Sequence, residues 1–254
     1  MSLISNFETA ILVPLVGPKC AASLASLNFA TDNCATLLVS KFLGYAIIVN
    51  AAIQKLPQLL KIYNAGNAAG VSLAGYLLET SAFAISLAYN YRSGNPISTY
   101  GELAFLALSD VLICTLIMLY SRKTSALLLF LLTITAAGAV LSHPTLVPTS
   151  TLAVLQASTI GLGISSKVPQ IYRNFKAGGT GQLSRATVFM QFGGSAARLF
   201  TLLQEVKDTL LIVSCGISVS LNLVNVSQMI YYNAGKAPKQ AKVWRSGTFG
   251  FPVL

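Results

Sequence analysis

Seven stretches of mainly apolar residues follow one another along this chain, each close to the ~20 residues that a helix needs to cross a bilayer. They lie at residues 38–60, 71–90, 101–120, 125–141, 149–172, 186–204 and 209–232. Only 9% of the residues are charged, whereas a typical soluble domain has about 25%. We therefore predict an all-α membrane protein with seven transmembrane helices. This composition excludes a soluble enzyme, a disordered chain and a disulfide-stapled secreted module.

The basic residues between these stretches predict the orientation of the chain. With the N-terminus outside the cytoplasm, the outer loops and span ends contain four basic residues: Lys19, Lys41, Arg92 and Lys207. The inner loops and the C-terminal tail then contain ten: Lys61, Arg122, Lys123, Arg173, Lys176, Arg185, Lys236, Lys239, Lys242 and Arg245. Because basic residues concentrate on the cytoplasmic side, we place the C-terminus in the cytoplasm. The net charge of +10 then reflects topology, and we expect no nucleic-acid partner.

Two terminal segments flank the apolar stretches. Residues 1–36 are moderately apolar but are interrupted by two prolines and a glycine, which predicts an interfacial segment before the first span. No basic run precedes their apolar stretch, so we do not expect a cleaved signal peptide. Residues 233–254 are polar and basic and predict a cytoplasmic tail.

A shift of 112 residues brings related residues of the two halves into register. The sequence KLPQ at 55–58 recurs as KVPQ at 167–170. The same shift places Glu79 on Gln191. A single shift that holds without gaps across three spans indicates an internal repeat.

The repeat predicts how the seven spans are organised. Residues 37–121 and 149–232 each form a three-helix repeat, and the almost purely apolar helix 125–141 links them. One linker helix makes the two repeats run in the same direction. We therefore predict a 3+1+3 arrangement of two parallel repeats about an axis along the membrane normal.

Each copy of the repeated motif contains a proline followed by a glutamine, Pro57 with Gln58 and Pro169 with Gln170. A proline inside a helix removes a backbone hydrogen bond. In lipid the freed carbonyl must find a partner in the protein, and Gln58 and Gln170 are placed to supply one. The kinks are either static features of packing or a pair of hinges. Because they recur at matched places, we favour hinges that move or line a site.

Ionisable residues inside the spans are candidates for a binding site, because each costs at least ~2.5–3.5 kcal/mol at membrane depth. Glu79, Asp110 and Arg198 lie well within spans, and Lys55 and Lys167 precede the paired prolines. Structural roles are the alternative. Glu79 or Asp110 can pair with Arg198 or a lysine and lock the bundle, and the two lysines can extend to the cytoplasmic interface.

No catalytic motif is found in the sequence. His143 lies in a loop without a nucleophile or carboxylate at motif spacing, and the chain has no glycine-rich nucleotide loop and no paired acidic motif. Cys114 and Cys215 fall in apolar stretches, whereas Cys20 and Cys34 can pair if the N-terminus is lumenal. We expect no enzymatic activity, no catalytic residue, no metal site and no cofactor.

The repeated Pro-Gln motifs resemble those of the PQ-loop family, which includes the sugar facilitators called SWEETs and cystinosin-type lysosomal amino-acid exporters. A narrower resemblance rests on KLPQLLKIYNAGNAAGVSL (55–73) and GGTGQLSRATVFMQFGGSAARLFTLLQEVKD (178–208). These stretches are similar to the family of mannose-phosphate-dolichol utilization defect proteins. The likeness covers about residues 12–233 and leaves out the tail.

The narrower resemblance implies a protein of the endoplasmic reticulum membrane. Such a protein is required for the use of dolichol-phosphate-mannose and dolichol-phosphate-glucose in N-glycan, GPI-anchor and protein mannosylation pathways. The partners implied are these lipid-linked sugars and the bilayer, and we favour a role in handling or moving the lipid. The alternatives are a facilitator of a small soluble sugar or amino acid, which the fold permits, and a non-transporting partner of lumenal glycosyltransferases.

The resemblance also suggests where substrate binds. In SWEET-like proteins a polar pair on the third helix of each repeat faces a central cavity, and the 112-residue shift pairs Asp110 with Asn222 in this way. Lys55, Lys167 and Arg198 suit the phosphate, Arg198 through its forked geometry. The candidate substrate-binding residues are Asp110, Asn222, Glu79, Gln191, Arg198, Lys55 and Lys167.

Overall fold

The computed structural model describes residues 13–25, 34–68, 70–180 and 185–233, which form helices joined by short turns and contain no strand. The helices are α2 (Val13–Ala25), α3 (Cys34–Gln54), α4 (Leu56–Ala65), α5 (Leu73–Arg92), the short 3₁₀ helix η2 (Ile97–Thr99), α6 (Gly101–Tyr120), α7 (Thr124–Ser142), α8 (Thr149–Ala177), α9 (Arg185–Glu205) and α10 (Thr209–Asn233). The all-helical prediction is confirmed for this part of the chain. Much of the predicted N-terminal segment and the predicted tail from residue 234 lie outside the described residues.

Four helical segments are long and apolar enough to cross a membrane, by length and composition. They are Cys34–Ala65, which joins α3 to α4, Gly101–Tyr120, Thr124–Ser142 and Thr209–Tyr232. Helices α5, α8 and α9 coincide with the other three predicted spans but carry more polar side chains. A multi-pass membrane protein is therefore supported, and the spanning role of these three helices stays a prediction.

The helix boundaries follow the 112-residue shift. Helix α4 ends at Ala65 and α8 at Ala177, while α5 begins at Leu73 and α9 at Arg185. Gly66 and Gly178 follow the first two ends, both with a φ of 61°. This left-handed conformation closes a helix and carries little steric cost in glycine. Around the connection between their first two spans, helices of the two copies thus end and begin at matched positions.

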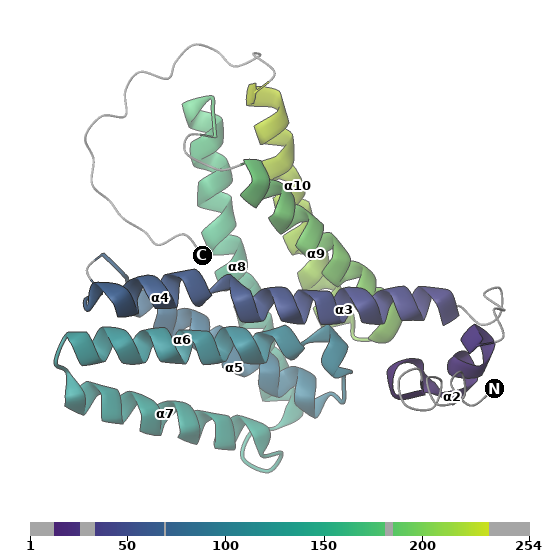
Figure 1. Ribbon diagram of the computed structural model, residues 1–254, viewed down its shortest axis with the longest axis horizontal. Coiled ribbons are helices and arrows are strands. Elements are labelled where there is room, and N and C mark those ends of the chain that lie inside the picture. Colours follow the sequence, from purple (N-terminus) through teal and green to yellow (C-terminus); the bar gives the residue numbers. More distant parts are fainter. Residues whose placement is uncertain (1–12, 26–33, 69, 181–184, 234–254) are drawn as a thin grey trace.

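The two copies lie at a steep angle to each other. We call α3 to α6 the first unit and α8 to α10 the second unit. Figure 1 shows α3, α4, α6 and α7 running alongside one another, while α8, α9 and α10 project away from them. The units meet where α3 contacts α9 and α5 contacts α8. This differs from the side-by-side parallel arrangement predicted from the linker helix.

An apolar core at the ends of the helices explains where the units meet. Tyr89 near the end of α5 packs with Leu152 near the start of α8 and with Leu202 near the end of α9. The core is completed by Val206, Leu211 and Cys215. Packing of this cluster at one end of each unit joins the two units there.

Cys20 of α2 and Cys34 at the start of α3 form a disulfide in the structure. The pairing anticipated for a lumenal N-terminus is therefore present. Ala21 and Cys34 are buried together beside it, with Leu37 and Leu38 packed around them. The bond fixes the N-terminal helix against the first span.

We predict that Gly44→Ala destabilises the protein. A Cβ at Gly44 would collide with the carbonyl oxygen of Ser98 in η2, which is backbone and cannot rotate away. Overpacking of this kind costs about 1–3 kcal/mol, so thermal unfolding of the detergent-purified variant should begin at a lower temperature. Gly161→Ala is the matched control, because its Cβ would meet nothing within 4 Å. Equal stability of the two variants would contradict this close approach of α3 and η2.

Candidate functional site

A charged cluster joins the three helices of the first unit. Lys55 lies at the break between α3 and α4, and its Nζ donates to Asp110 Oδ1 of α6 at 2.5 Å. The same Nζ lies 2.7 Å from Glu79 Oε1 of α5. The rings of Tyr76 and Phe83 lie 5.4 and 5.3 Å from the ammonium group, within range of cation–π attraction. This is the pairing of Glu79 and Asp110 with a lysine that was one of the alternatives from sequence.

A second cluster joins the helices of the second unit. Lys167 of α8 donates from Nζ to Gln191 Oε1 of α9 at 2.7 Å. Asn222 of α10 donates from Nδ2 to the backbone oxygen of Gln191 at 3.3 Å and to Ser195 Oγ at 3.1 Å. Lys167, Gln191 and Asn222 therefore link three helices.

The two clusters occupy equivalent positions but differ in charge. The 112-residue shift makes Lys55, Glu79 and Asp110 equivalent in position to Lys167, Gln191 and Asn222. The first cluster holds one cation and two carboxylates, whereas the second holds a cation and two neutral amides. Each has one deeply buried oxygen without a hydrogen-bond partner among the described residues, Asp110 Oδ2 and Asn222 Oδ1. The fold therefore provides two matched acceptors inside the helices.

Asp110 and Asn222 remain in separate clusters. No hydrogen bond or ion pair joins them within the described ranges, and each is bound to helices of its own unit. The steep angle between the units in Figure 1 accounts for this separation. The expectation that both face one central cavity therefore remains a prediction about function.

Arg198 connects the two units. Its Nη2 forms an ion pair with Glu102 Oε1 at the start of α6. Glu102 is buried, and its second oxygen has no partner. Sequence analysis considered a structural pair for Arg198 but named only Glu79 and Asp110 as its carboxylate partners.

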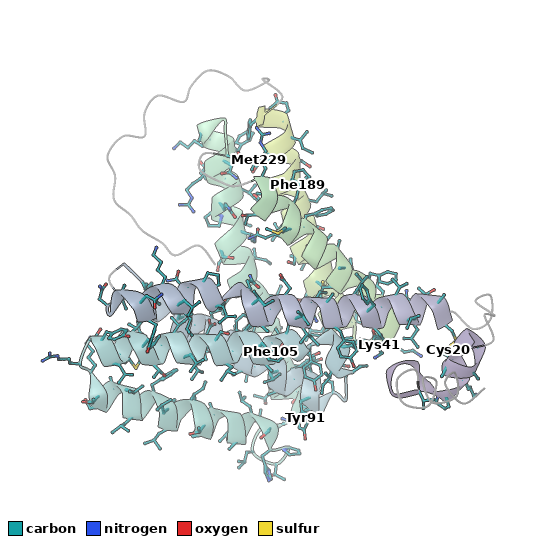
Figure 2. All side chains as sticks on the ribbon, viewed as in Figure 1. Cys20, Lys41, Tyr91, Phe105, Phe189 and Met229 are labelled. Atoms are coloured by element: carbon teal, nitrogen blue, oxygen red, sulfur yellow. A yellow bond between two sulfur atoms is a disulfide. The ribbon has the colours of Figure 1, made fainter. Side chains whose placement is uncertain are left out.

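Glu205 of α9 accepts hydrogen bonds from three side chains of the first unit. Its Oε1 accepts from Ser40 Oγ at 2.6 Å, and its Oε2 accepts from Lys41 Nζ at 2.5 Å and Ser98 Oγ at 2.6 Å. The Glu205 side chain is only 1% exposed. Figure 2 labels Lys41 where α3 crosses α9, far from Phe189 and Met229 in the outer part of the second unit. Sequence analysis missed this cluster. The feature that could have indicated it is the presence of charged residues at the ends of predicted spans.

The predicted hinges differ between the repeats. The helix breaks at Lys55, so that Pro57 stands in the first turn of α4, where the missing N–H costs little. Helix α8 instead continues through Pro169. Gln58 and Gln170 are half-buried, and neither amide forms a side-chain hydrogen bond with the described residues. The matched motif therefore produces a break in one repeat and a continuous helix in the other.

An apolar groove of about 560 Å³ lies between α3, α5, α6 and α7. Small residues leave space for the groove, and aromatic side chains form much of its wall. Tyr45, Tyr91, Tyr100 and Phe105 line it together with Gly101 and Gly138. Figure 2 labels Tyr91 and Phe105 in this region of the first unit. Its volume falls within the ~300–1,000 Å³ range of ligand pockets.

We predict that replacing the two equivalent lysines has unequal effects on stability. Lys55→Met would leave Glu79 and Asp110 together without a cation, and breaking a buried ion pair costs about 3–5 kcal/mol. Lys167→Met would leave only the neutral Gln191, so we expect no comparable loss. Thermal unfolding in detergent measures both. Lys55→Met combined with Glu79→Gln and Asp110→Asn should recover stability, and a Lys167→Met variant as unstable as Lys55→Met would contradict the charge difference.

Comparison with known families identifies the repeat. A model described as PQ loop repeat matches residues 39–99 and again residues 151–211. The two matches are displaced by the same 112 residues as the helix boundaries and the polar clusters. No solved structure matches the chain.

Proposed function

We propose, from the premise that this membrane protein is a PQ-loop protein with two repeats, that it handles dolichol-phosphate-linked sugars. The proposed role is to present or redistribute dolichol-phosphate-mannose and dolichol-phosphate-glucose in the endoplasmic reticulum membrane. Lumenal N-glycan, GPI-anchor and mannosylation pathways would then use them. Two sequence blocks, 55–73 and 178–208, support this narrower assignment through their resemblance to the dolichol utilization family. The proposed role requires no enzymatic step.

The observation that carries the proposal is the pair of matched polar clusters within the helices. Polar groups at membrane depth are costly and mark substrate pathways. Asp110 Oδ2 and Asn222 Oδ1 are unpartnered acceptors at equivalent positions, and sugar hydroxyls are donors that suit such oxygens. The matched positions offer a sugar head group the same kind of contact in each repeat.

The apolar groove supports a lipid rather than a soluble sugar. Tyr45, Tyr91, Tyr100 and Phe105 form a largely apolar wall, which fits an isoprenoid tail better than the hydroxyl-rich surface of a free sugar. A lipid-linked sugar has both a polar head and a long apolar tail. The clusters and the groove together provide surfaces for both parts.

The Cys20–Cys34 disulfide supports the proposed orientation. Disulfides persist in oxidising compartments such as the endoplasmic reticulum lumen and are rare in the cytosol. A lumenal N-terminus also agrees with the concentration of basic residues on the opposite side of the membrane. Both observations support a lumenal start of α3.

We predict that Cys20 and Cys34 are oxidised in sealed microsomes. A maleimide of high mass should leave the protein unmodified at these positions until a reductant and a detergent are both added. The control is Cys20→Ser, which frees Cys34 for labelling once the membrane is opened. Labelling of intact wild-type microsomes from the cytoplasmic side would contradict a lumenal N-terminus.

Reconstitution tests the proposed function directly. Liposomes containing labelled dolichol-phosphate-mannose are prepared with and without the purified protein, and transbilayer movement is followed. We expect faster movement with wild type. Loss of two hydrogen-bonding groups in Asp110→Ala, Asn222→Ala should slow it by about tenfold or more.

The matched control is Thr133→Val, Thr135→Val. These hydroxyls lie on α7, bond only to their own helix and are exposed, so their loss should leave movement unchanged. Wild-type protein that moves no lipid-linked sugar would contradict the proposal. Uptake of free sugar or amino acid in its place would identify a solute facilitator. Co-purification with lumenal glycosyltransferases, without any movement, would identify a partner role.

A further inference from the structure

A small cleft with both polar and aliphatic lining residues opens between α8 and α10 of the second unit. Its volume is about 220 Å³, below the ~300–1,000 Å³ of typical ligand pockets. Hydroxyl groups and one amine line it: Thr159, Ser166, Lys167, Ser214 and Ser218. Ser214 and Ser218 are four residues apart on one helix and therefore share a face. The cleft fits a head group rather than a whole lipid.

Lys167 brings a positive charge into this cleft without a carboxylate to balance it. The chain contains seven acidic residues, and five of them lie in the described ranges. Each of the five already has a partner elsewhere: Glu79 and Asp110 bind Lys55, Glu102 binds Arg198, Glu205 binds Lys41, and Asp208 accepts from Tyr89. Among the described residues, the Lys167 ammonium group donates only to the neutral oxygen of Gln191. An unbalanced cation at membrane depth is costly, so this position favours an anion.

The hydroxyl groups of α10 can complete the site. Ser214 is half-buried and Ser218 exposed, and neither side chain is hydrogen-bonded to the described residues. Their O–H groups are free to donate to an anion beside the ammonium group. Gly163 on α8 lines the same cleft, and a Cβ built there would meet nothing within 4 Å. This arrangement combines a point charge, two donors and open space.

Most residues that line the cleft are not repeated at equivalent positions of the first repeat. In the first repeat the shift of 112 places Glu102 where Ser214 stands and buried Ala51 where Gly163 stands. The remaining candidate cations for an anion, Lys55 and Arg198, are already neutralised by carboxylates. Of the three basic residues expected to bind phosphate, the structure thus leaves one with an unbalanced charge.

From this cleft we infer an anion-binding site in which Lys167, Ser214 and Ser218 bind the phosphate of a sugar-phosphate ligand. The inference rests on the proposed function, because it assigns the phosphate of the lipid-linked sugar to the second repeat. The shared chemistry is a phosphate ester, whether it is attached to an isoprenoid chain or free in water. The oxygens Asp110 Oδ2 and Asn222 Oδ1 then remain available for the sugar hydroxyls.

Binding to full-length protein in nanodiscs tests the site. The probes are dolichol-phosphate-mannose, dolichol-phosphate, dolichol without phosphate, and soluble mannose-1-phosphate, and native mass spectrometry measures occupancy. We expect Lys167→Met to raise the dissociation constant for phosphate-bearing lipid by about tenfold or more, since hydrogen bonds to charged groups contribute ~1.5–3 kcal/mol. Dolichol occupancy should not change. Lys167→Arg should retain binding.

Two further variants make the result specific. Lys176→Met removes the same charge from an exposed position in the last turn of α8, and binding should remain as in wild type. Ser214→Ala, Ser218→Ala should weaken the phosphate-bearing lipids while leaving the charge in place, and it does not depend on how Lys167→Met folds. Equal loss in Lys176→Met, or unchanged binding in both Lys167→Met and the serine pair, would overturn the site.

The probes separate this inference from the proposed function. If Lys167→Met weakens mannose-1-phosphate but wild type binds no phosphate-bearing lipid, the anion site is supported and the lipid-handling function fails. If wild type moves dolichol-phosphate-mannose and Lys167→Met binds it unchanged, the function is supported and the anion site is overturned. Weakening confined to the phosphate-bearing lipids supports both.

Discussion

Charge pairing inside apolar helices is the constraint on which this structure depends. A cation or carboxylate at membrane depth must be paired or hydrogen-bonded, and the chain has 17 basic but only seven acidic residues. The described carboxylates are therefore placed where helices from different parts of the chain meet. Asp110 and Glu79 hold the first unit together, and Glu102 and Glu205 hold it to the second.

Much of the fold could be predicted from the sequence because it is encoded locally. Hydropathy located the helices, and one shift of 112 related KLPQ at 55–58 to KVPQ at 167–170. The interface between the units could not be predicted. Whether Arg198 pairs with Glu102 or with Asp110 depends on how helices that are distant in sequence cross. Until that crossing is known, a residue at the end of a span, such as Glu205, cannot be distinguished from a charged loop residue.

Sequence analysis named the residues of the candidate site, but it did not predict that they form two separate clusters. Sequence analysis gave an ion pair between a lysine and Glu79 or Asp110 as one alternative, and the structure brings both carboxylates within 2.5–2.7 Å of the Lys55 amine. Their equivalents Lys167, Gln191 and Asn222 keep the positions but lose both negative charges. The two halves therefore place equivalent residues at equivalent positions, but carboxylates outnumber cations in the first cluster and the second has a cation without a carboxylate.

The contacts of Glu205 limit how the repeats can move. A cycle that rocked one unit against the other would have to release Ser40, Lys41 and Ser98 from a single buried carboxylate in one step. Bending within a repeat breaks none of these bonds, and the first unit already has an interruption at Lys55. We therefore expect the crossing of α3 and α9 to stay fixed. Bending is expected inside a repeat rather than between the two units.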